Sequence, residues 1–253
     1  MTDTKIALIT GANKGLGRSA ALHLAQVGVD ILFTYRSNES EAQGVVAEIE
    51  ALGRRAVALP LSLDAEADFA AFADTVRKTL DEDFGRDTFD FLLNNAGVGL
   101  HAPLADTTPA QFDQLLHVHF RGVFFLTQAL LPLVADGGRI LNTSTGLTRF
   151  SIPGYGAYAA MKAAVESYTT YLAQELGPRG IAVNVIAPGA IATDFGGGAV
   201  RDNADVNAYI SATTAMGRVG EADDIGEAVA GIFTGLSGWT TGQRIEVSGG
   251  QSL

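Results

Sequence analysis

The alternation of short apolar runs with longer helical patterns, from end to end, constrains the fold of this chain more than any other feature. Seven runs read as strands, and they cover residues 6–10, 31–34, 56–61, 91–93, 139–142, 181–186 and 244–247. Between them, apolar residues recur at three- and four-residue spacing, as in residues 16–27 and 39–52. Several runs are almost continuously apolar, which is typical of strands buried on both faces. The pattern predicts an α/β fold, a doubly wound parallel sheet of about seven strands with helices on both faces.

Nothing in the sequence divides the chain into separate units. Its 253 residues hold no internal repeat, low-complexity tract or linker, and this length suits one large α/β domain. We therefore expect a single domain over residues 1–253. Local helix-start signals agree, because Thr108, Pro109 and Gln111 form a capping pattern and Asn38 and Glu41 have a similar spacing.

Composition argues against several classes of function. The formal net charge is −11 with no lysine or arginine block, which argues against nucleic acid or an anionic membrane as a partner. Cysteine is absent, and His23, His101 and His117 show no ligand pattern, so no metal is expected. No apolar run approaches the roughly 18 residues of a membrane span. The first residues lack a signal-peptide layout, so we expect a cytoplasmic protein.

The first predicted strand runs directly into a glycine-rich loop that opens the first helix. Residues 10–17 read Thr-Gly-Ala-Asn-Lys-Gly-Leu-Gly. Glycine permits a tight turn here, lets the backbone approach a pyrophosphate and allows close packing of the helix on the strand. The free N–H groups at the helix N-terminus can then hold the phosphates. A glycine turn can also simply join a strand to a helix. Its position nevertheless predicts a Rossmann-type dinucleotide site that includes Gly11, Asn13, Lys14, Gly15, Leu16 and Gly17.

This loop resembles the cofactor loop of the short-chain dehydrogenases/reductases, and other motifs follow in that family's order. Residues 94–97 read Asn-Asn-Ala-Gly and resemble its NNAG motif, while Tyr158 and Lys162 have the spacing of its Y-x-x-x-K motif. The resemblance covers essentially the whole chain and is strongest to the group of 3-oxoacyl-carrier-protein reductases. It implies an oxidoreductase that transfers a hydride between a nicotinamide and a carbonyl or alcohol. The further cofactor contacts that it implies are Ser62, Leu63, Asn95, Ala96, Gly97, Pro188, Gly189, Ile191 and Thr193.

The end of the second predicted strand indicates which dinucleotide is bound. A carboxylate there would bind the adenosine ribose diol and select NAD, but the sequence has Arg36 and Ser37 instead. Arg36 is placed to meet a 2′-phosphate, Ser37 can add a hydrogen bond, and Lys14 is a second cation nearby. These residues favour NADP(H), with a solvated loop arginine as the alternative interpretation of Arg36. By resemblance, Ser62 stands where the family usually has an aspartate that contacts adenine.

Tyr158 and Lys162 are the candidate reacting pair. Four residues apart on a helix, they share a face and are separated by about 6 Å of rise. A nearby ammonium lowers the pKa of a phenol from its unperturbed value near 10, which suits tyrosine to exchange the alcohol proton. Lys162 can also hold the nicotinamide ribose. Tyr155 lies about 10.5 Å of rise from Lys162, so Tyr158 is the predicted acid/base. An ordinary surface pair is the alternative.

The resemblance also implies a hydroxyl that polarises the substrate carbonyl from the end of the fifth strand. The family's serine usually lies thirteen residues before the tyrosine, which corresponds to Thr145. Threonine has the same donor and acceptor capacity as serine. Ser144 is the alternative if the loop shifts by one residue.

The clearest departure from the family is His119. The family normally has an asparagine there, which helps to hold a water in a proton relay to the lysine. Histidine can also donate and accept hydrogen bonds, so the relay can persist. A buried core histidine without a catalytic role is an equal alternative.

Three segments are expected to line the substrate site, at residues 98–101, 150–155 and 192–200. They contain Leu100, Phe150, Ile152 and Phe195, which predict a small, partly apolar carbonyl or alcohol substrate. A reductase of small ketones, diketones or sugars and a 3-oxoacyl-carrier-protein reductase both remain open. The second needs a basic docking patch, to which Arg179 could contribute. A non-catalytic NADPH-binding sensor is a third, less favoured reading.

By resemblance, the chain is expected to form a homotetramer through the helices near residues 111–134 and 154–176. The apolar content of the first helical region exceeds what one face of a sheet needs. The residues concerned are Phe112, Leu116, Phe120, Phe124 and Leu130.

Overall fold

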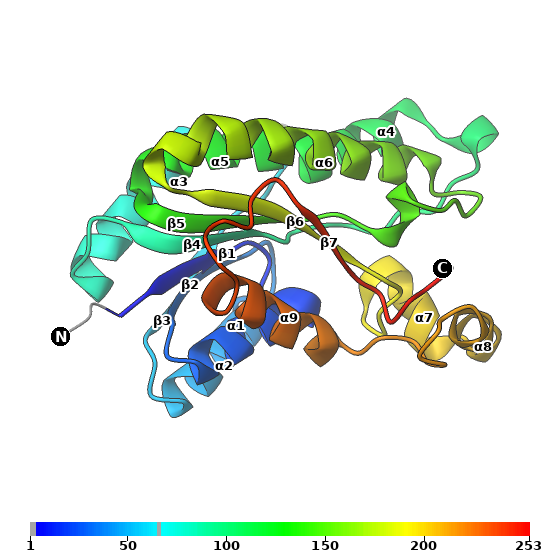
Figure 1. The fold of residues 1–253 in the computed structure, drawn as a ribbon, viewed down its shortest axis with the longest axis horizontal. Coiled ribbons are helices and arrows are strands. Elements are labelled where there is room, and N and C mark those ends of the chain that lie inside the picture. The colour runs from blue at the N-terminus through cyan, green and yellow to red at the C-terminus, as the bar shows by residue number, and fades with distance from the viewer. Residues whose placement is uncertain (1–3, 65–66) are drawn as a thin grey trace.

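The computed structural model describes residues 4–64 and 67–253, whose strands form one seven-stranded sheet (Figure 1). All neighbouring strands are parallel, and their order is β3-β2-β1-β4-β5-β6-β7. The predicted fold class is therefore confirmed. The strands are β1 (Ile6–Ile9), β2 (Asp30–Tyr35), β3 (Ala56–Pro60), β4 (Phe89–Asn94), β5 (Val134–Thr143), β6 (Ala182–Pro188) and β7 (Arg244–Val247).

The strand boundaries differ most at β5, which begins well before the predicted start at Arg139. Val134 pairs with Phe89, and the register then shifts before Phe91. Glycines at 137 and 138 mask this extension in the sequence, because glycine interrupts a strand pattern and often marks an irregularity.

Successive side chains of each strand point to opposite faces of the sheet, and they contribute to two hydrophobic cores, one on each face. Helices α1 (Gly15–Gln26), α2 (Glu39–Ala51) and α9 (Ala222–Thr234) cover one face, and α3 (Phe69–Thr79), α5 (Gly122–Leu130) and α6 (Gly156–Leu176) cover the other (Figure 1). In β1, for example, Ala7 and Ile9 belong to the first core and Ile6 and Leu8 to the second.

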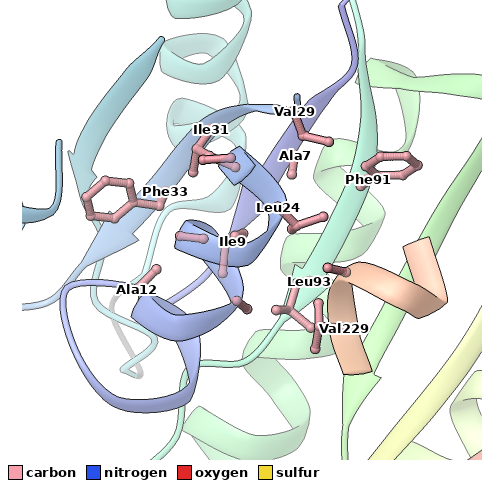
Figure 2. Packing of buried hydrophobic residues seen from close by; sticks show 14 of the residues in the cluster. Ala7, Ile9, Ala12, Leu24, Val29, Ile31, Phe33, Phe91, Leu93 and Val229 are labelled. Atoms are coloured by element: carbon pink, nitrogen blue, oxygen red, sulfur yellow. The ribbon is translucent and has the colours of Figure 1, made fainter. Parts of the chain in front are cut away.

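The first core anchors the helix that follows the glycine loop. Figure 2 shows Leu24 of α1 and Val229 of α9 packed with Ile9 of β1 and Leu93 of β4. Leu24 is fully buried, so truncating it to alanine should cost about 2–5 kcal/mol. This packing fixes where the N-terminus of α1 lies relative to the end of β1.

The capping signals in the sequence are present in the structure. Helix α4 (Pro109–Leu116) begins with a capping box, in which Thr108 accepts from the Gln111 amide and Gln111 accepts from the Thr108 amide. The Asn38 side chain accepts from the Glu41 amide at the start of α2.

Shorter elements complete the chain. Helices α7 (Ala199–Asp202) and α8 (Ala204–Ala212) lie to one side, beyond the end of β6 and near the C-terminus (Figure 1). In the part of the chain that the structure describes, Leu80–Phe84 and His117–Arg121 form π-helical turns, and the second joins α4 to α5. The 3-10 turns are Leu104–Asp106, Leu131–Leu133, Gly146–Thr148, Gly177–Arg179 and Phe195–Gly198.

The strand order reverses between β1 and β4, which lie side by side in the middle of the sheet. In open parallel sheets, the crevice for a ligand lies at the carboxyl ends of the strands next to such a reversal. Within residues 4–64 and 67–253, no helix has the length and apolar character to cross a bilayer.

Candidate active site

The glycine loop after β1 has the conformations that its glycines were expected to permit. Gly11 and Gly15 have φ values of +68° and +57°, which side-chain-bearing residues rarely adopt. Gly17 lies inside α1, where a Cβ atom would lie 2.6 Å from the Asn95 amide nitrogen and nearer still to the carbonyl of Gly11. The loop therefore passes too close to its neighbours for any other residue at position 17.

Hydroxyl and amide side chains hold this loop against β2 and β4. Thr10 Oγ1 accepts from the backbone amides of Asn95 at 2.9 Å and Ala96 at 3.0 Å. The Asn95 side chain donates to the carbonyls of Thr10 and Gly11, at 3.0 and 3.2 Å. Thr34 Oγ1 accepts from the Gly11 amide at 3.1 Å. Sequence reasoning missed the roles of Thr10 and Thr34. Their signal is a hydroxyl at the end of a strand, since Thr10 follows β1 directly and Thr34 is the second-last residue of β2.

The N-terminus of α1 is open to an anion. Lys14 precedes the helix without a capping side-chain hydrogen bond, and the first turn contains no acidic residue. No heavy atom lies within 4 Å of the position that a Gly15 Cβ would occupy, apart from its chain neighbours and the helix backbone. Asn13 donates to Glu41 at 2.9 Å, which ties the loop to α2. Uncapped N–H groups beside open space fit a phosphate group.

The two predicted cations near this loop differ in their surroundings. Arg36 is exposed at the end of β2, and within residues 4–64 and 67–253 it has no hydrogen-bond or ion-pair partner. Lys14 instead forms an ion pair with Asp194, at 3.6 Å and with both side chains largely exposed. Ser37 is exposed beside Arg36.

A carboxylate lies close to the expected adenine contact after β3, although not at the aligned position. Ser62 Oγ donates to Asp64 Oδ2 at 2.7 Å. Leu63 between them is buried and packs close to Gly122. This carboxylate is visible in the sequence, because Asp64 stands two residues after Ser62, the position where the resembled family usually has its aspartate.

Tyr158 and Lys162 lie on the buried face of α6. The Lys162 Nζ is 5.8 Å from the centre of the Tyr158 ring and donates to the carbonyl of Thr143 at 2.8 Å. Tyr155 precedes α6, is only partly buried, and packs edge-on against His101 with a centroid distance of 5.1 Å. Tyr158 is therefore the tyrosine that α6 places on the same buried face as Lys162.

The pKa values of this pair differ from the sequence-based expectation. Burial raises the pKa of Tyr158 above its ordinary value, and a hydrogen bond with Thr145 acts in the opposite direction. Burial also lowers the pKa of Lys162 to about 7. The pKa of Tyr158 is therefore shifted in the direction opposite to the sequence-based expectation, because burial outweighs the other influences on the phenol.

The two candidate hydroxyls face different partners. Thr145 follows β5 and is the hydroxyl that interacts with Tyr158. Its Oγ1 also accepts from the Leu147 amide at 3.3 Å. Ser144 is buried and donates to Glu166 at 2.5 Å. The structure therefore places the Thr145 hydroxyl beside the phenol of Tyr158, whereas the Ser144 hydroxyl is hydrogen-bonded to Glu166.

His119 lies in the π-helical turn, fully buried beside Tyr158 with the ring centroids 5.0 Å apart. Its Nε2 donates to the carbonyl of Val98 at 2.8 Å, and Nδ1 has no hydrogen-bond partner within the described parts of the chain. Burial, together with the charge of Lys162, lowers the pKa of His119 to about 3. His119 is therefore a neutral side chain whose Nδ1 can accept a hydrogen bond.

Gly97 makes room for this histidine. A Cβ at position 97 would lie 2.9 Å from His119 Cε1. The last glycine of the Asn-Asn-Ala-Gly motif thus permits a ring where the resembled family carries a smaller amide.

The segment after β6 turns back onto the C-terminal strand. The Gly189 amide donates to the carbonyl of Val247, and a Cβ at position 189 would lie 2.8 Å from the Ser248 Cα. Ile191 forms a parallel bridge with Gly220, and Thr193 accepts from the Phe195 amide at 3.3 Å. Pro188, at the end of β6, is the last strand residue before this turn.

Apolar side chains surround Tyr158 on the substrate side. Val98, Leu100 and Tyr155 pack with it, and the ring of Phe195 lies 6.0 Å from the Tyr158 ring. Phe195 is partly exposed and forms the outer part of this wall, and Ile152, whose carbonyl accepts from the Tyr155 amide, is also partly exposed. Phe150 instead packs against Gly146 and under the guanidinium of Arg149.

Known proteins share both this sequence and this fold. Residues 11–252 match the sequence model of a family described as enoyl-(acyl carrier protein) reductase. The tetrahydroxynaphthalene reductase PfmaG of Pestalotiopsis fici is 34% identical over 257 residues, covering 97% of this chain and 91% of that protein. The structure of the promiscuous reductase LugOII, which catalyses keto-reduction at C1 in lugdunomycin biosynthesis, has a TM-score of 0.93 at 38% identity and covers 100% of both chains.

A second structure is that of the angucycline C-6 ketoreductase LanV with bound NADP. Its TM-score is also 0.93, at 33% identity, over 99% of this chain and 96% of that chain. The family model and these relatives each span nearly the whole sequence, and the resemblance seen in the motifs is confirmed. The chain belongs to the short-chain dehydrogenase/reductase family of oxidoreductases.

Proposed function

We propose that this protein is an NADP(H)-dependent ketoreductase, in which Tyr158 protonates the oxygen of an apolar ketone as hydride reaches its carbonyl carbon. The observation that carries the proposal is the convergence of Tyr158, Thr145 and Lys162 at the carboxyl edge of the sheet that also holds the glycine loop. A reacting centre next to a dinucleotide loop is what hydride transfer requires.

The residues around the loop fit an anionic dinucleotide. The uncapped N-terminus of α1 and the open space over Gly15 suit the pyrophosphate, and the unpartnered Arg36 suits a 2′-phosphate. NADP(H), when bound, supplies or accepts the hydride. The residues that hold it in this proposal are Gly11, Asn13, Lys14, Gly15, Leu16, Gly17, Arg36, Ser37, Ser62, Leu63, Asn95, Ala96, Gly97, Tyr158, Lys162, Pro188, Gly189, Ile191 and Thr193.

Tyr158 is the proposed proton donor. Its phenol is protonated in the neutral range even at its ordinary pKa near 10, and burial, which raises that pKa, keeps it so. The phenol can therefore donate to a carbonyl oxygen, and contacts with the ketone and the cofactor must offset the cost of removing its proton. Thr145 orients that oxygen with a second hydrogen bond, and the ammonium form of Lys162 stabilises the phenolate left behind.

The wall around Tyr158 supports an extended, partly aromatic ketone as the substrate. Phe195, Tyr155 and His101 offer aromatic faces and edges, and Leu100 and Ile152 add apolar surface. The relatives reduce hydroxynaphthalenes and angucyclines, according to their names, which are ring ketones or their tautomers. A fused-ring ketone is therefore the class we propose.

A carrier-protein substrate has less support. Arg179, the cation considered for a docking patch, is paired with Asp136 and donates to the carbonyls of Leu131 and Val134. Those contacts lie near the start of β5, whereas Thr145 follows the end of the same strand, so the two lie at opposite ends of the sheet's strands. Arg179 therefore does not lie beside the site.

The helices α5 and α6 support the proposal of a homotetramer. Phe120, Phe124 and Tyr168 border an open, mostly apolar groove between them, and Tyr171 and Phe125 are exposed. Such a surface is typical of a contact between subunits. Sedimentation velocity should give the mass of four chains, and a monomer at micromolar concentration would contradict the assignment.

The first test is NADPH oxidation, followed at the nicotinamide absorbance, against fused-ring ketones, simple ketones, keto sugars and 3-oxoacyl thioesters, with NADH in parallel. Turnover of a ring ketone with NADPH preferred is expected. Tight NADPH binding without turnover of any compound would replace the proposal with a cofactor-binding sensor. Preference for the thioesters would restore the carrier-protein substrate.

A further inference from the structure

One face of α6 holds four consecutive residues at the end of β5. Positions 158, 162, 166 and 169 of the helix lie on this face because they recur at three- and four-residue spacing. Each contacts a different residue of the strand end. Three of the pairs are hydrogen bonds, Asn142 with Thr169, Thr143 with Lys162 and Ser144 with Glu166. In the fourth, the Thr145 hydroxyl interacts with the phenol of Tyr158 and opposes the rise of its pKa.

Glu166 is the charged member of this series that the reaction does not use. Its Oε1 accepts three hydrogen bonds, from Ser144 Oγ at 2.5 Å, Thr148 Oγ1 at 2.7 Å and Arg244 Nε at 2.9 Å. Ser144 and Thr148 flank Thr145 on its two sides. Through these hydrogen bonds, the Glu166 carboxylate holds in place the short turn that carries the Thr145 hydroxyl.

Arg244 reaches the same turn from β7. Its Nη2 donates to the carbonyl of Thr145 at 3.1 Å, its Nη1 to Glu246 at 2.8 Å, and its Nε to Glu166. About a quarter of the side chain is exposed, 26%, so these bonds are partly shielded from water. The guanidinium thus connects the last strand to the backbone of Thr145.

We propose that Glu166 and Arg244 are positioning residues, which fix the Thr145 hydroxyl against Tyr158 by holding the turn from two sides. This inference rests on the proposed ketoreductase function. Neither side chain contacts Tyr158, so both act through Thr145. Without them, the Ser144 hydroxyl loses its acceptor, and the Thr145 carbonyl keeps only the hydrogen bond from Thr148 Oγ1 at 3.0 Å. The turn is then held less firmly, and the Thr145 hydroxyl can move away from the phenol of Tyr158.

Substitution of either residue should lower the rate of the chemical step and spare cofactor binding. Glu166→Gln removes the charge opposite Arg244, and Arg244→Met removes the donor to Thr145. Each should lower kcat by about tenfold to a hundredfold, because small misplacements of a reacting group cost that much. The dissociation constant for NADPH should stay within about twofold. Arg244→Lys, which keeps the charge, should recover part of the loss.

A double-mutant cycle separates positioning from general support of the fold. In a Thr145→Ala background, Glu166→Gln should lower kcat by less than about twofold further, because its effect is exerted through the missing hydroxyl. An equal loss in both backgrounds would overturn the proposal. Parallel loss of kcat, NADPH binding and thermal stability would also overturn it, since that is the signature of a purely structural pair.

Arg139→Met is the matched control. Arg139 lies in β5, away from the site, and its guanidinium also donates to backbone carbonyls, those of Ile232 and Leu236. It should lose stability while keeping kcat for the folded fraction. An equal loss of kcat in this variant would show that any partly buried arginine has the effect, and would remove the special role of Arg244.

A crystal structure of the Arg244→Met protein tests the proposal without turnover. The turn that carries Thr145 should shift and move the Thr145 hydroxyl further from the phenol of Tyr158, and an unmoved Thr145 would overturn the proposal. Absence of turnover by the unsubstituted protein would count against the ketoreductase function instead, so the two failures are distinguishable.

Discussion

At the scale of single residues, burial shifts the pKa values of the proposed reacting groups. Tyr158, Lys162 and His119 are all buried, and each has a pKa shifted toward its neutral form. The site therefore contains a protonated phenol, an amine that titrates near neutrality and a neutral imidazole. Such shifted groups cluster at functional sites because catalysis needs them.

Tyr158→Phe removes the proposed acid and little else. The ring remains packed against His119, so NADPH binding and stability should persist. The rate of ketone reduction should fall by about a hundredfold to ten-thousandfold, since general acid catalysis contributes on the order of 10²–10⁴. Stopped-flow NADPH oxidation measures this loss, and substantial residual reduction would show that another group delivers the proton.

Arg36→Ala tests the choice of cofactor. The guanidinium has no partner within the described residues, so its removal should leave stability unchanged. Binding of NADPH should weaken by roughly tenfold or more through loss of a charge-assisted contact, while NADH is unaffected. Comparison of kcat/KM for the two cofactors measures the change, and an unchanged ratio would discard the phosphate contact.

Lys162 should impose the pH dependence of the free enzyme. Its pKa is lowered to about 7, so it loses its proton as the pH rises through neutrality. If the ammonium form is active, kcat/KM should be constant below pH 6 and fall toward tenfold per pH unit above pH 8. A profile that is flat to pH 9 would mean that the charge of Lys162 is not required.

His119 supplies the control for this profile, because its pKa of about 3 places its titration outside the working range. His119→Asn should leave the shape of the profile unchanged while providing the amide that the family usually has. Loss of folding in this variant would instead identify His119 as a core residue.

At the scale of elements, the junction of β1 with α1 is fixed by close approach. Gly17→Ala places a methyl group against Asn95 and the Gly11 carbonyl, so the loop must shift. We expect NADPH binding to weaken by at least tenfold and stability to fall by about 1–3 kcal/mol from overpacking. Fluorescence titration and urea unfolding measure the two effects.

Gly44→Ala in α2 is the matched substitution, because its Cβ would meet no heavy atom within 4 Å beyond its own helix. It should stabilise the protein by about 0.5–1 kcal/mol, the helix preference of alanine over glycine. Equal effects of the two substitutions would show that Gly17 is not sterically constrained.

At the scale of the whole molecule, a buried carboxylate stabilises the end of the sheet that lies away from the site, where the strands begin. Asp30 at the start of β2 is fully buried and accepts from Arg54 Nε at 2.8 Å, Arg55 Nε at 2.9 Å and the Arg55 amide at 3.0 Å. Asp30→Ala leaves these donors without their acceptor and should lower the free energy of unfolding by about 3 kcal/mol.

Ketone reduction by the folded fraction should be unchanged in Asp30→Ala, because Asp30 lies at the end of the sheet away from the loops that form the site. The exposed pair of Arg179 with Asp136 is the control, and Asp136→Ala should change stability by less than about 1 kcal/mol. Similar losses in both variants would contradict the argument from burial.

The sequence by itself determined the fold class and the glycine loop. Alternating apolar runs and helical periodicity are local properties, so seven strands and the start of α1 could be located from short windows. The extension of β5 to Val134 could not, because it depends on pairing with Phe89 across the sheet. The spacing of Tyr158 and Lys162 likewise placed both on one helix face.

Only the tertiary structure decided what surrounds those residues. It turned Ser144 toward Glu166 and Thr145 toward Tyr158, a choice that two adjacent hydroxyls in a sequence do not reveal. It also reversed the expected pKa shift of Tyr158, since desolvation depends on burial by distant segments. Arg244, far along the chain, reaches Thr145 because β7 pairs with β6 beside β5. Periodicity fixes which way a side chain faces along its own element, whereas contacts between elements exist only once the sheet has assembled.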